Sequence, residues 1–276
     1  MTADAIKSMK LYSQVDRVFR DLRAAGIADD APLSVDQLSQ FDQYHYFGTE
    51  AVEAAIRHAG ISPASHVLEI GAGIGGPARV IADRSGCSVT ALELQPDLNE
   101  VATSLTARCG LSERVDHACG DALTYALPDE THDALVSWLA LFHIPKRDRL
   151  FARCHATLKP GGVFYAEDLY KLGDFTPEQH EQLTQMVFGQ SMSTEDEYVA
   201  ALKAAGFADV RFDNRTASWT DFCVTRLAAY RAARARHLSI HGPAVVDGLT
   251  EFYQTMVDLF ESGNLGGTVV TARKSG

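Results

Sequence analysis

The chain has 276 residues, of which 46% are hydrophobic, and this content suits one large domain or one domain with an insertion. Its formal net charge of -11 at pH 7 disfavours general attraction to nucleic-acid phosphates and to anionic membrane surfaces. No stretch approaches the roughly 18 consecutive apolar residues of a membrane span, and the first residues lack the apolar segment of a signal peptide. We therefore expect a cytoplasmic protein with neither a membrane span nor a nucleic-acid partner.

The N-terminal part of the chain is expected to be helical. Residues 3–25 carry apolar side chains at helical spacing, and a second helix is expected from Glu50 to Gly60. The aromatic segment FDQYHYFGTE lies between them. We assign residues 1–60 to N-terminal helices that form part of a cap.

From His66 onward, short β-rich segments alternate with helical ones. Strands are expected at 66–70, 88–94, 114–121, 133–142 and 162–170, with helices at 77–86, 97–110 and 146–158. This alternation is typical of βαβ units in a parallel sheet that has helices on both faces. Residues 61–170 are therefore assigned to an α/β core.

Residues 171–276 are expected to complete the sheet and to carry inserted helices. Helical stretches at 176–188 and 194–205 precede a sixth strand at 209–216, and a helical segment broken near 241–243 precedes a last strand at 266–274. We expect the insertions, about 171–205 and 217–262, to join residues 1–60 over the carboxyl edge of the sheet. The five cysteines are scattered without CxxC spacing, so neither a disulfide framework nor a zinc site is indicated.

A glycine-rich turn follows the first strand in the sequence LEIGAGIGG, with Gly71, Gly73, Gly75 and Gly76. Glycines in this place let the backbone approach a ligand at the start of a helix. Taken alone, the spacing also fits a dinucleotide fold in which Glu93 would hold a ribose. Glu69 separates the alternatives, because a carboxylate suits a ligand ammonium and would repel a pyrophosphate.

Together with Glu93, the GD pair at 120–121, the run SWLALFH and the sequence LKPGG, this turn resembles the class I S-adenosylmethionine-dependent methyltransferases. The motifs YHYFG and GNLGG resemble the branch that includes phosphobase, sterol and natural-product enzymes. The resemblance implies a Rossmann-like, seven-stranded, mostly parallel α/β sheet with an antiparallel last strand and a helical cap. It also implies S-adenosylmethionine as the cofactor and a small molecule as the methyl acceptor.

The resemblance further implies roles for individual residues. Glu93 would bind both ribose hydroxyls, and Asp121 would accept a hydrogen bond from the adenine amino group. Ala122 would offer its backbone N–H, Leu94 would pack on the adenine face, and Trp138 would lie near the methionine chain. These residues join Tyr46, Glu69, Gly71, Gly73 and Gly75 as the predicted cofactor set. The alternative for Tyr44 and Tyr46 is that they attach the N-terminal helices to the core.

Candidates for handling the acceptor's proton follow the fourth and fifth strands. They are His143, Glu167 and Asp168, with a structural role as the alternative for His143. Substrate contacts are expected from Tyr44, Trp219, Arg226 and Arg234; the two arginines share a face if residues 226–241 form one helix. A solvated surface helix is the alternative for these arginines.

The function expected from these features is methyl transfer to a small anionic metabolite, with C-methylation of an isoprenoid diphosphate-like substrate favoured. The alternatives are N- or O-methylation of a phosphobase, an amine or another natural product. A non-catalytic regulatory protein and an NAD-dependent oxidoreductase are alternatives of other classes. No resident metal is expected, and a divalent ion would be needed only for a diphosphate; the sequence is compatible with a homo-oligomer.

Overall fold

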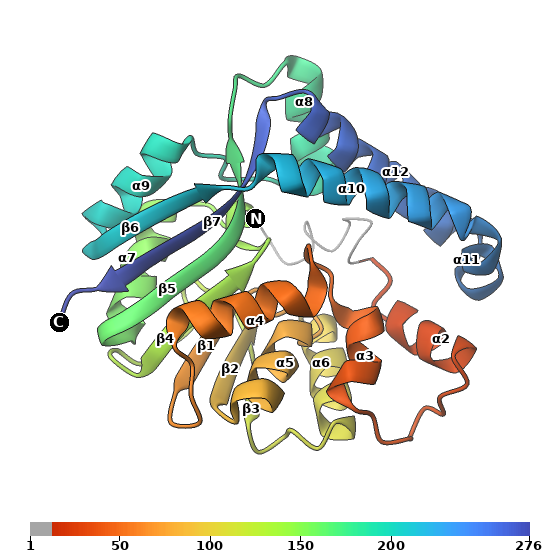
Figure 1. The fold of residues 1–276 in the computed structure, drawn as a ribbon, viewed down its shortest axis with the longest axis horizontal. Coiled ribbons are helices and arrows are strands. Elements are labelled where there is room, and N and C mark those ends of the chain that lie inside the picture. The colour runs from red at the N-terminus through yellow and green to blue at the C-terminus, as the bar shows by residue number, and fades with distance from the viewer. Residues whose placement is uncertain (1–12) are drawn as a thin grey trace.

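The computed structural model describes residues 13–276 and contains one seven-stranded sheet in the order β3-β2-β1-β4-β5-β7-β6 (Figure 1). The strands are β1 (His66–Ile70), β2 (Ser88–Glu93), β3 (Val115–Cys119), β4 (His132–Trp138), β5 (Leu158–Lys171), β6 (Phe207–Asn214) and β7 (Leu265–Lys274). Strands β1 to β5 run parallel, whereas β7 is antiparallel to both β5 and β6. The predicted Rossmann-like sheet with an antiparallel last strand is confirmed.

The central strand β1 lies between β2 and β4. Chain order reverses here, because β2 and β3 extend to one side of β1 and β4 and β5 to the other. In open α/β sheets, ligands bind beyond the carboxyl ends of the strands at such a reversal. The glycine turn that follows β1 is therefore at the expected position for a ligand site.

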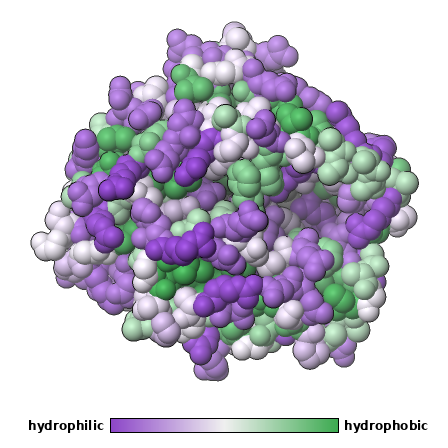
Figure 2. All heavy atoms as spheres, viewed as in Figure 1, coloured by the Kyte–Doolittle hydropathy of each residue, from purple (hydrophilic) through white to green (hydrophobic). Residues whose placement is uncertain are grey.

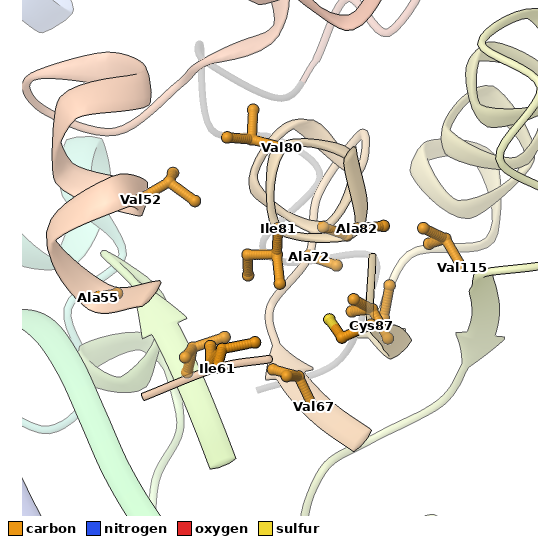
Figure 3. Packing of buried hydrophobic residues seen from close by; sticks show 14 of the residues in the cluster. Val52, Ala55, Ile61, Val67, Ala72, Val80, Ile81, Ala82, Cys87 and Val115 are labelled. Carbon is orange, nitrogen blue, oxygen red and sulfur yellow. The ribbon is translucent and has the colours of Figure 1, made fainter. Parts of the chain in front are cut away.

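Helices cover both faces of the sheet. One face carries α4 (Gly48–Ala59), α5 (Gly76–Ser85) and α6 (Pro96–Arg108), and the other carries α7 (Arg147–Thr157) and α9 (Glu195–Ala204) (Figure 1). In Figure 3, Val52 of α4 and Ile81 of α5 lie in one cluster with Val67 of β1. All three side chains are fully buried, so α4 is fixed to the core by apolar packing.

The remaining helices form the cap. Its main part is α10 (Thr216–Ala232), α11 (Arg234–His241) and α12 (Pro243–Glu261), with α10 and α12 lying side by side (Figure 1). Helix α8 (Pro177–Gln182) continues into the π-helical turn η2 (Leu183–Val187), which packs against α12. Helices α2 (Arg17–Ala24) and α3 (Val35–Asp42) pack together, and α2 contacts α11.

Two helices expected in the cap pack on the sheet instead. Helix α4 packs against α5, and α9 packs against α7 and β6. The reason for α9 is apolar, because Tyr198 and Leu202 are buried among side chains of the sheet and α7. Helix α3, which the sequence did not predict, begins with a capping box at Ser34 and Gln37. The first part of the helix expected at 3–25 lies outside the described residues.

Hydrophilic side chains cover much of the face seen in Figure 2, with hydrophobic ones scattered among them. Within residues 13–276, no helix is both long and apolar enough to cross a bilayer.

Candidate active site

The glycine turn joins β1 to α5 with three glycines in the left-handed region, Gly71 at φ 76°, Gly73 at φ 54° and Gly75 at φ 77°. Each has a different surrounding. A Cβ atom on Gly71 would lie 2.2 Å from the Cβ of Ala140, and one on Gly75 would lie 2.8 Å from the guanidinium of Arg79. A Cβ on Gly73 would meet no atom within 4 Å. Neighbouring side chains therefore leave no room for a side chain at Gly71 and Gly75, whereas the space beside Gly73 is free.

A cavity of about 300 Å³ lies beside this turn. Six of the predicted cofactor residues line it, namely Gly71, Gly73, Glu93, Leu94, Asp121 and Ala122. Sequence reasoning missed other lining residues, among them Gln95, Leu98, Ile144 and Lys146. Gln95 and Leu98 follow Glu93 closely in sequence, so their proximity to the strand end was the available signal.

Glu93 ends β2 at the wall of this cavity and is only 6% exposed. The backbone N–H of Gly73 donates to its Oε2 (2.8 Å), and the N–H of Gln95 donates to its Oε1 (2.9 Å). Each carboxylate oxygen retains acceptor capacity beyond one such bond. The two backbone donors therefore hold the carboxylate in one orientation beside the cavity.

Asp121 lies two residues after the end of β3. Its Oδ1 accepts from the backbone N–H of Leu123 (2.8 Å), and its side chain is exposed toward the cavity that it lines. Two carboxylates fixed by backbone donors thus border one pocket, which is suited to a ligand that carries hydroxyl or amino hydrogens.

Glu69, one residue before the end of β1, is only 1% exposed. Burial raises its pKa to about 8, against the lowering effect of the Arg79 charge. Its Oε2 is buried with no hydrogen-bond partner among the described residues. An unsatisfied buried carboxylate oxygen is costly, so this position favours a ligand that brings a positive charge or a donor.

Trp138, the last residue of β4, is paired in register with Glu167 of β5. The Tyr165 hydroxyl donates to Glu167 Oε1 (3.1 Å), and the ring of His45 lies 5.7 Å from that of Trp138. Burial raises the pKa of Glu167 to about 7, while the side chains of Tyr165 and Trp138 act in the opposite direction. Glu167 therefore changes charge near neutral pH.

Asp168 faces the other side of the sheet. Its Oδ2 accepts from the Arg147 guanidinium (2.8 Å) and the Tyr198 hydroxyl (3.1 Å), and its Oδ1 accepts from the N–H of Phe142 (3.1 Å). The carboxylate is fully buried and does not border the cavity. The structure therefore gives Asp168 a structural position between α7 and α9, contrary to the predicted catalytic one.

His143 closes the 3₁₀ turn η1 (Leu141–His143) and lines the cavity. Its Nδ1 lies 3.0 Å from the carbonyl oxygen of Phe188. Burial lowers the pKa of His143 to about 4, so the ring is neutral at physiological pH. The position agrees with both roles considered for it, and its catalytic role stays a prediction.

The predicted substrate residues in the cap separate into packed and exposed ones. The ring of Tyr46 meets that of Trp219 edge-on at 4.9 Å, and both side chains are buried. The guanidinium of Arg226 donates to the carbonyl of His45 (3.0 Å) and lies over Phe222 (4.8 Å). These residues attach the N-terminal segment to the cap, and for Tyr46 this is the packing role considered as the alternative.

The structure corrects the prediction that Arg234 shares a helix face with Arg226. The backbone leaves helical geometry at Ala233, where α10 ends and α11 begins, so Arg226 and Arg234 do not share the face of one helix. The Arg234 guanidinium pairs with Asp247 of α12 (2.7 Å), and both side chains are largely exposed. Tyr44 is half-buried beneath the guanidinium of Arg17 (4.9 Å to the ring centre) and does not line the cavity.

A buried ion pair that the sequence did not predict fastens α3 to the glycine turn. Arg79 of α5 is fully buried and donates to Asp42 (2.8 Å), to the carbonyl of Ile74 (2.6 Å) and to Thr106 (3.1 Å). Burial raises the pKa of Asp42, and the Arg79 charge opposes this shift. The available signal was a charged residue, Arg79, between the small and apolar residues that begin α5.

Part of the chain matches a known protein family. Residues 68–166 match the model of the methyltransferase domain. A sterol 24-C-methyltransferase of Gibberella zeae is 30% identical over 174 residues, covering 58% of this chain and 45% of the relative. The chain thus spans less than half the length of this curated relative.

Two solved structures share the fold. Phosphoethanolamine N-methyltransferase 2 of Haemonchus contortus, in complex with phosphomonomethylethanolamine and S-adenosylhomocysteine, has a TM-score of 0.79 at 22% identity, covering 85% of this chain and 55% of that one. Geranyl diphosphate C-methyltransferase of Streptomyces coelicolor A3(2), in complex with Mg²⁺, a substrate thio-analogue and S-adenosylhomocysteine, has a TM-score of 0.68 at 14% identity, covering 82% and 76%. The comparisons thus show a methyltransferase domain at residues 68–166, in a chain that shares the fold of these enzymes.

Proposed function

We propose that this chain binds S-adenosylmethionine in the cavity beside the glycine turn and transfers its methyl group to a small molecule. The observation that carries the proposal is Glu93, whose two carboxylate oxygens are each held by a backbone N–H at the cavity wall. A carboxylate fixed in this way can accept from both hydroxyls of a ribose. Asp121 and the backbone of Ala122 border the same cavity and would hold the adenine.

The methionine end of the cofactor fits the residues beyond the glycine turn. The unpartnered Oε2 of Glu69 and the open side of Gly73 leave an acceptor and space where an ammonium would lie. Trp138 would pack along the methionine chain. When bound, the cofactor supplies an electrophilic methyl group on a sulfonium, and the protein must align the acceptor, exclude water and receive the acceptor's proton.

Glu167, paired with Trp138 at the end of β4, is the proton acceptor that we favour. Its pKa, which burial raises to about 7, gives it a carboxylate that exists near neutral pH and is basic enough to take a proton. His143, with a pKa lowered to about 4, is the weaker base and would instead shape the cavity wall. Removal of a general base typically costs about 100-fold or more in rate.

For the acceptor, we propose an anionic amphiphile, with C-methylation of an isoprenoid diphosphate-like molecule favoured over N-methylation of a phosphobase. The cap supports this choice because its interior is aromatic and apolar, including Phe142, Trp219, Phe252 and Phe260. Among the described residues, no group of three or more His, Cys, Asp or Glu side chains is arranged to hold a metal ion. A divalent ion, where one is needed, would enter with the diphosphate.

Calorimetric titration with S-adenosylmethionine, S-adenosylhomocysteine and NAD tests the cofactor. We expect both adenosyl ligands to bind, and Glu93→Ala to weaken them roughly 100-fold because two charge-assisted hydrogen bonds are lost. Glu100→Ala, an exposed change on α6, is the matched control. Binding of NAD alone would contradict the proposal and revive the oxidoreductase alternative.

Turnover separates an enzyme from a regulatory protein that retains the fold. Geranyl diphosphate with Mg²⁺, and phosphoethanolamine without it, are incubated with the cofactor, and methylated products are measured by mass spectrometry. We expect a product from geranyl diphosphate that Glu167→Gln abolishes while its affinity for S-adenosylhomocysteine is unchanged. Product from phosphoethanolamine alone would move the assignment to the phosphobase alternative.

A further inference from the structure

A second polar cluster lies in the cap, outside the cofactor cavity. It is formed by Arg17 and Asp21 of α2, Tyr230 of α10, and His237 and His241 of α11. The rings of Tyr230 and His237 stack at 4.3 Å, those of His237 and His241 at 6.4 Å, and His241 Nε2 lies 2.9 Å from Asp21 Oδ1. Three helices thus bring these side chains into one contiguous group, which we call the cap polar cluster.

Four polar atoms of this cluster are buried without a hydrogen-bond partner in the part of the chain that the structure describes. They are Arg17 Nη1, Tyr230 Oη, His237 Nδ1 and His241 Nδ1. Arg17 is 7% exposed and His241 is 8% exposed. Because Nε2 of the neutral His241 ring donates to Asp21, its Nδ1 is an acceptor, and the unpartnered atoms that can donate are those of Arg17, Tyr230 and His237. Buried donors without partners are costly, so these three atoms favour a ligand with acceptor oxygens.

One guanidinium of the cluster is available to an anion. Arg17 carries a permanent positive charge, and its guanidinium lies over the ring of Tyr44 at 4.9 Å, while Asp21 is engaged by His241. The neighbouring Arg20 adds a second positive charge that is shared with Asp16 (3.1 Å). A guanidinium, a phenol hydroxyl and the imidazole of His237, which come from three helices, can donate to the several oxygens of a phosphoryl group.

A series of side-chain contacts leads from the cluster towards the proposed acceptor site. Tyr253 of α12 contacts the ring of Tyr230 (5.2 Å) on one side and the guanidinium of Arg226 (5.6 Å) on the other. Arg226 in turn binds the carbonyl of His45, whose ring contacts Trp138 beside Glu167. Side chains of the cap therefore connect the cluster continuously with the position where the methyl group would be transferred.

We propose that the cap polar cluster binds the phosphoryl end of the acceptor, with Arg17 as the principal ligand. This inference rests on the proposed function. It places recognition of the anion on α2 and on the part of α11 that is remote from Arg234, the first residue of that helix. The acceptor would extend from Glu167 to Arg17, where its phosphoryl oxygens would accept hydrogen bonds from Arg17 Nη1, the Tyr230 hydroxyl and His237 Nδ1. Arg17 would thus determine specificity for phosphorylated over neutral acceptors.

Titration with inorganic phosphate and with pyrophosphate, each with S-adenosylhomocysteine present, tests the inference. We expect pyrophosphate to bind, and Arg17→Gln to weaken it about 10-fold or more, since hydrogen bonds from a charged donor are worth about 1.5–3 kcal/mol. Arg23→Gln, on the same helix but 56% exposed and paired with Asp29, should bind as the wild type does. Arg17→Lys should recover part of the loss, because it keeps the charge but not the planar donor pair.

Tyr230→Phe removes one hydroxyl with little change in packing and is the second variant in case Arg17→Gln does not fold. We expect it to weaken pyrophosphate severalfold and to leave S-adenosylhomocysteine binding unchanged. Equal affinities in wild type, Arg17→Gln and Tyr230→Phe, or no pyrophosphate binding by a wild type that binds S-adenosylhomocysteine, would overturn the inference. Failure to bind S-adenosylhomocysteine would overturn the proposed function, while the pyrophosphate comparison would still decide the cap polar cluster.

Discussion

The carboxyl edge of the sheet and the cap use charged side chains in different ways. At the edge, the carboxylate of Glu93 is held by backbone N–H groups of its own loop and of the adjacent glycine turn. In the cap, the guanidinium of Arg226 binds the carbonyl of His45, 181 positions away in sequence, and lies over aromatic rings. Charges at the edge are therefore positioned by strand ends and turns, whereas charges in the cap are positioned by packing between distant segments.

The ion pair between Arg79 and Asp42 tests whether the edge depends on the N-terminal helices. Arg79→Met would leave Asp42 buried without its partner, and we expect a loss of about 3–5 kcal/mol in the free energy of unfolding. Urea denaturation measures this loss in the free energy of unfolding. Arg84→Met, on the same helix but with partly exposed ion pairs, is the control and should cost about 0–1 kcal/mol. Equal losses would show that α3 is not fastened to the turn through this pair.

Gly73 tests the open side of the glycine turn. Gly73→Ala keeps its surroundings free of contacts but strains a residue at φ 54°, so we expect a loss of about 1–2 kcal/mol in stability. Because the new methyl group would face the cavity, S-adenosylhomocysteine should bind about 10-fold or more weakly, as calorimetry can measure. Gly110, at φ 68°, also has no atom within 4 Å of an added Cβ, but it does not line this cavity. Gly110→Ala should therefore lower stability to a similar extent and leave the affinity for S-adenosylhomocysteine unchanged. Unchanged affinity in Gly73→Ala would place the cofactor elsewhere.

The difference between charges at the sheet edge and charges in the cap explains what the sequence could and could not predict. The strands, the glycine turn and the cavity positions of Glu93 and Asp121 follow from local patterns, because a strand end and its turn are specified within a few residues. Arg234 was misplaced because the helix break at Ala233 carries neither glycine nor proline. Asp168 was misjudged because its partners, Arg147 and Tyr198, come from two helices remote in sequence.

The pH dependence of stability tests the buried carboxylate of Glu69. Its pKa is raised to about 8 in the folded chain, so the folded state binds the proton more tightly than the unfolded state. The resulting stabilisation is complete below about pH 4.5 and is lost as pH rises through about 8. Between pH 7 and pH 8.5 we expect urea denaturation to show a loss on the order of 1 kcal/mol from this group. Glu69→Gln should remove that part of the slope and exposed Glu50→Gln should not; identical slopes would mean that Glu69 is ionised throughout.

The smallest expected effect concerns Arg234, whose exposed pair with Asp247 contrasts with the packed guanidinium of Arg226. We expect Arg234→Gln to change the free energy of unfolding by about 0–1 kcal/mol, because solvent screens the pair and its side chains are mobile. Arg226→Gln should cost about 1–3 kcal/mol, since it loses both a charged hydrogen bond and contacts with aromatic rings. Both variants are compared by urea denaturation and by titration with pyrophosphate. If Arg234→Gln weakened pyrophosphate as much as Arg17→Gln does, the anion would lie at the far end of α11 and the contrast between packed and exposed arginines would fail.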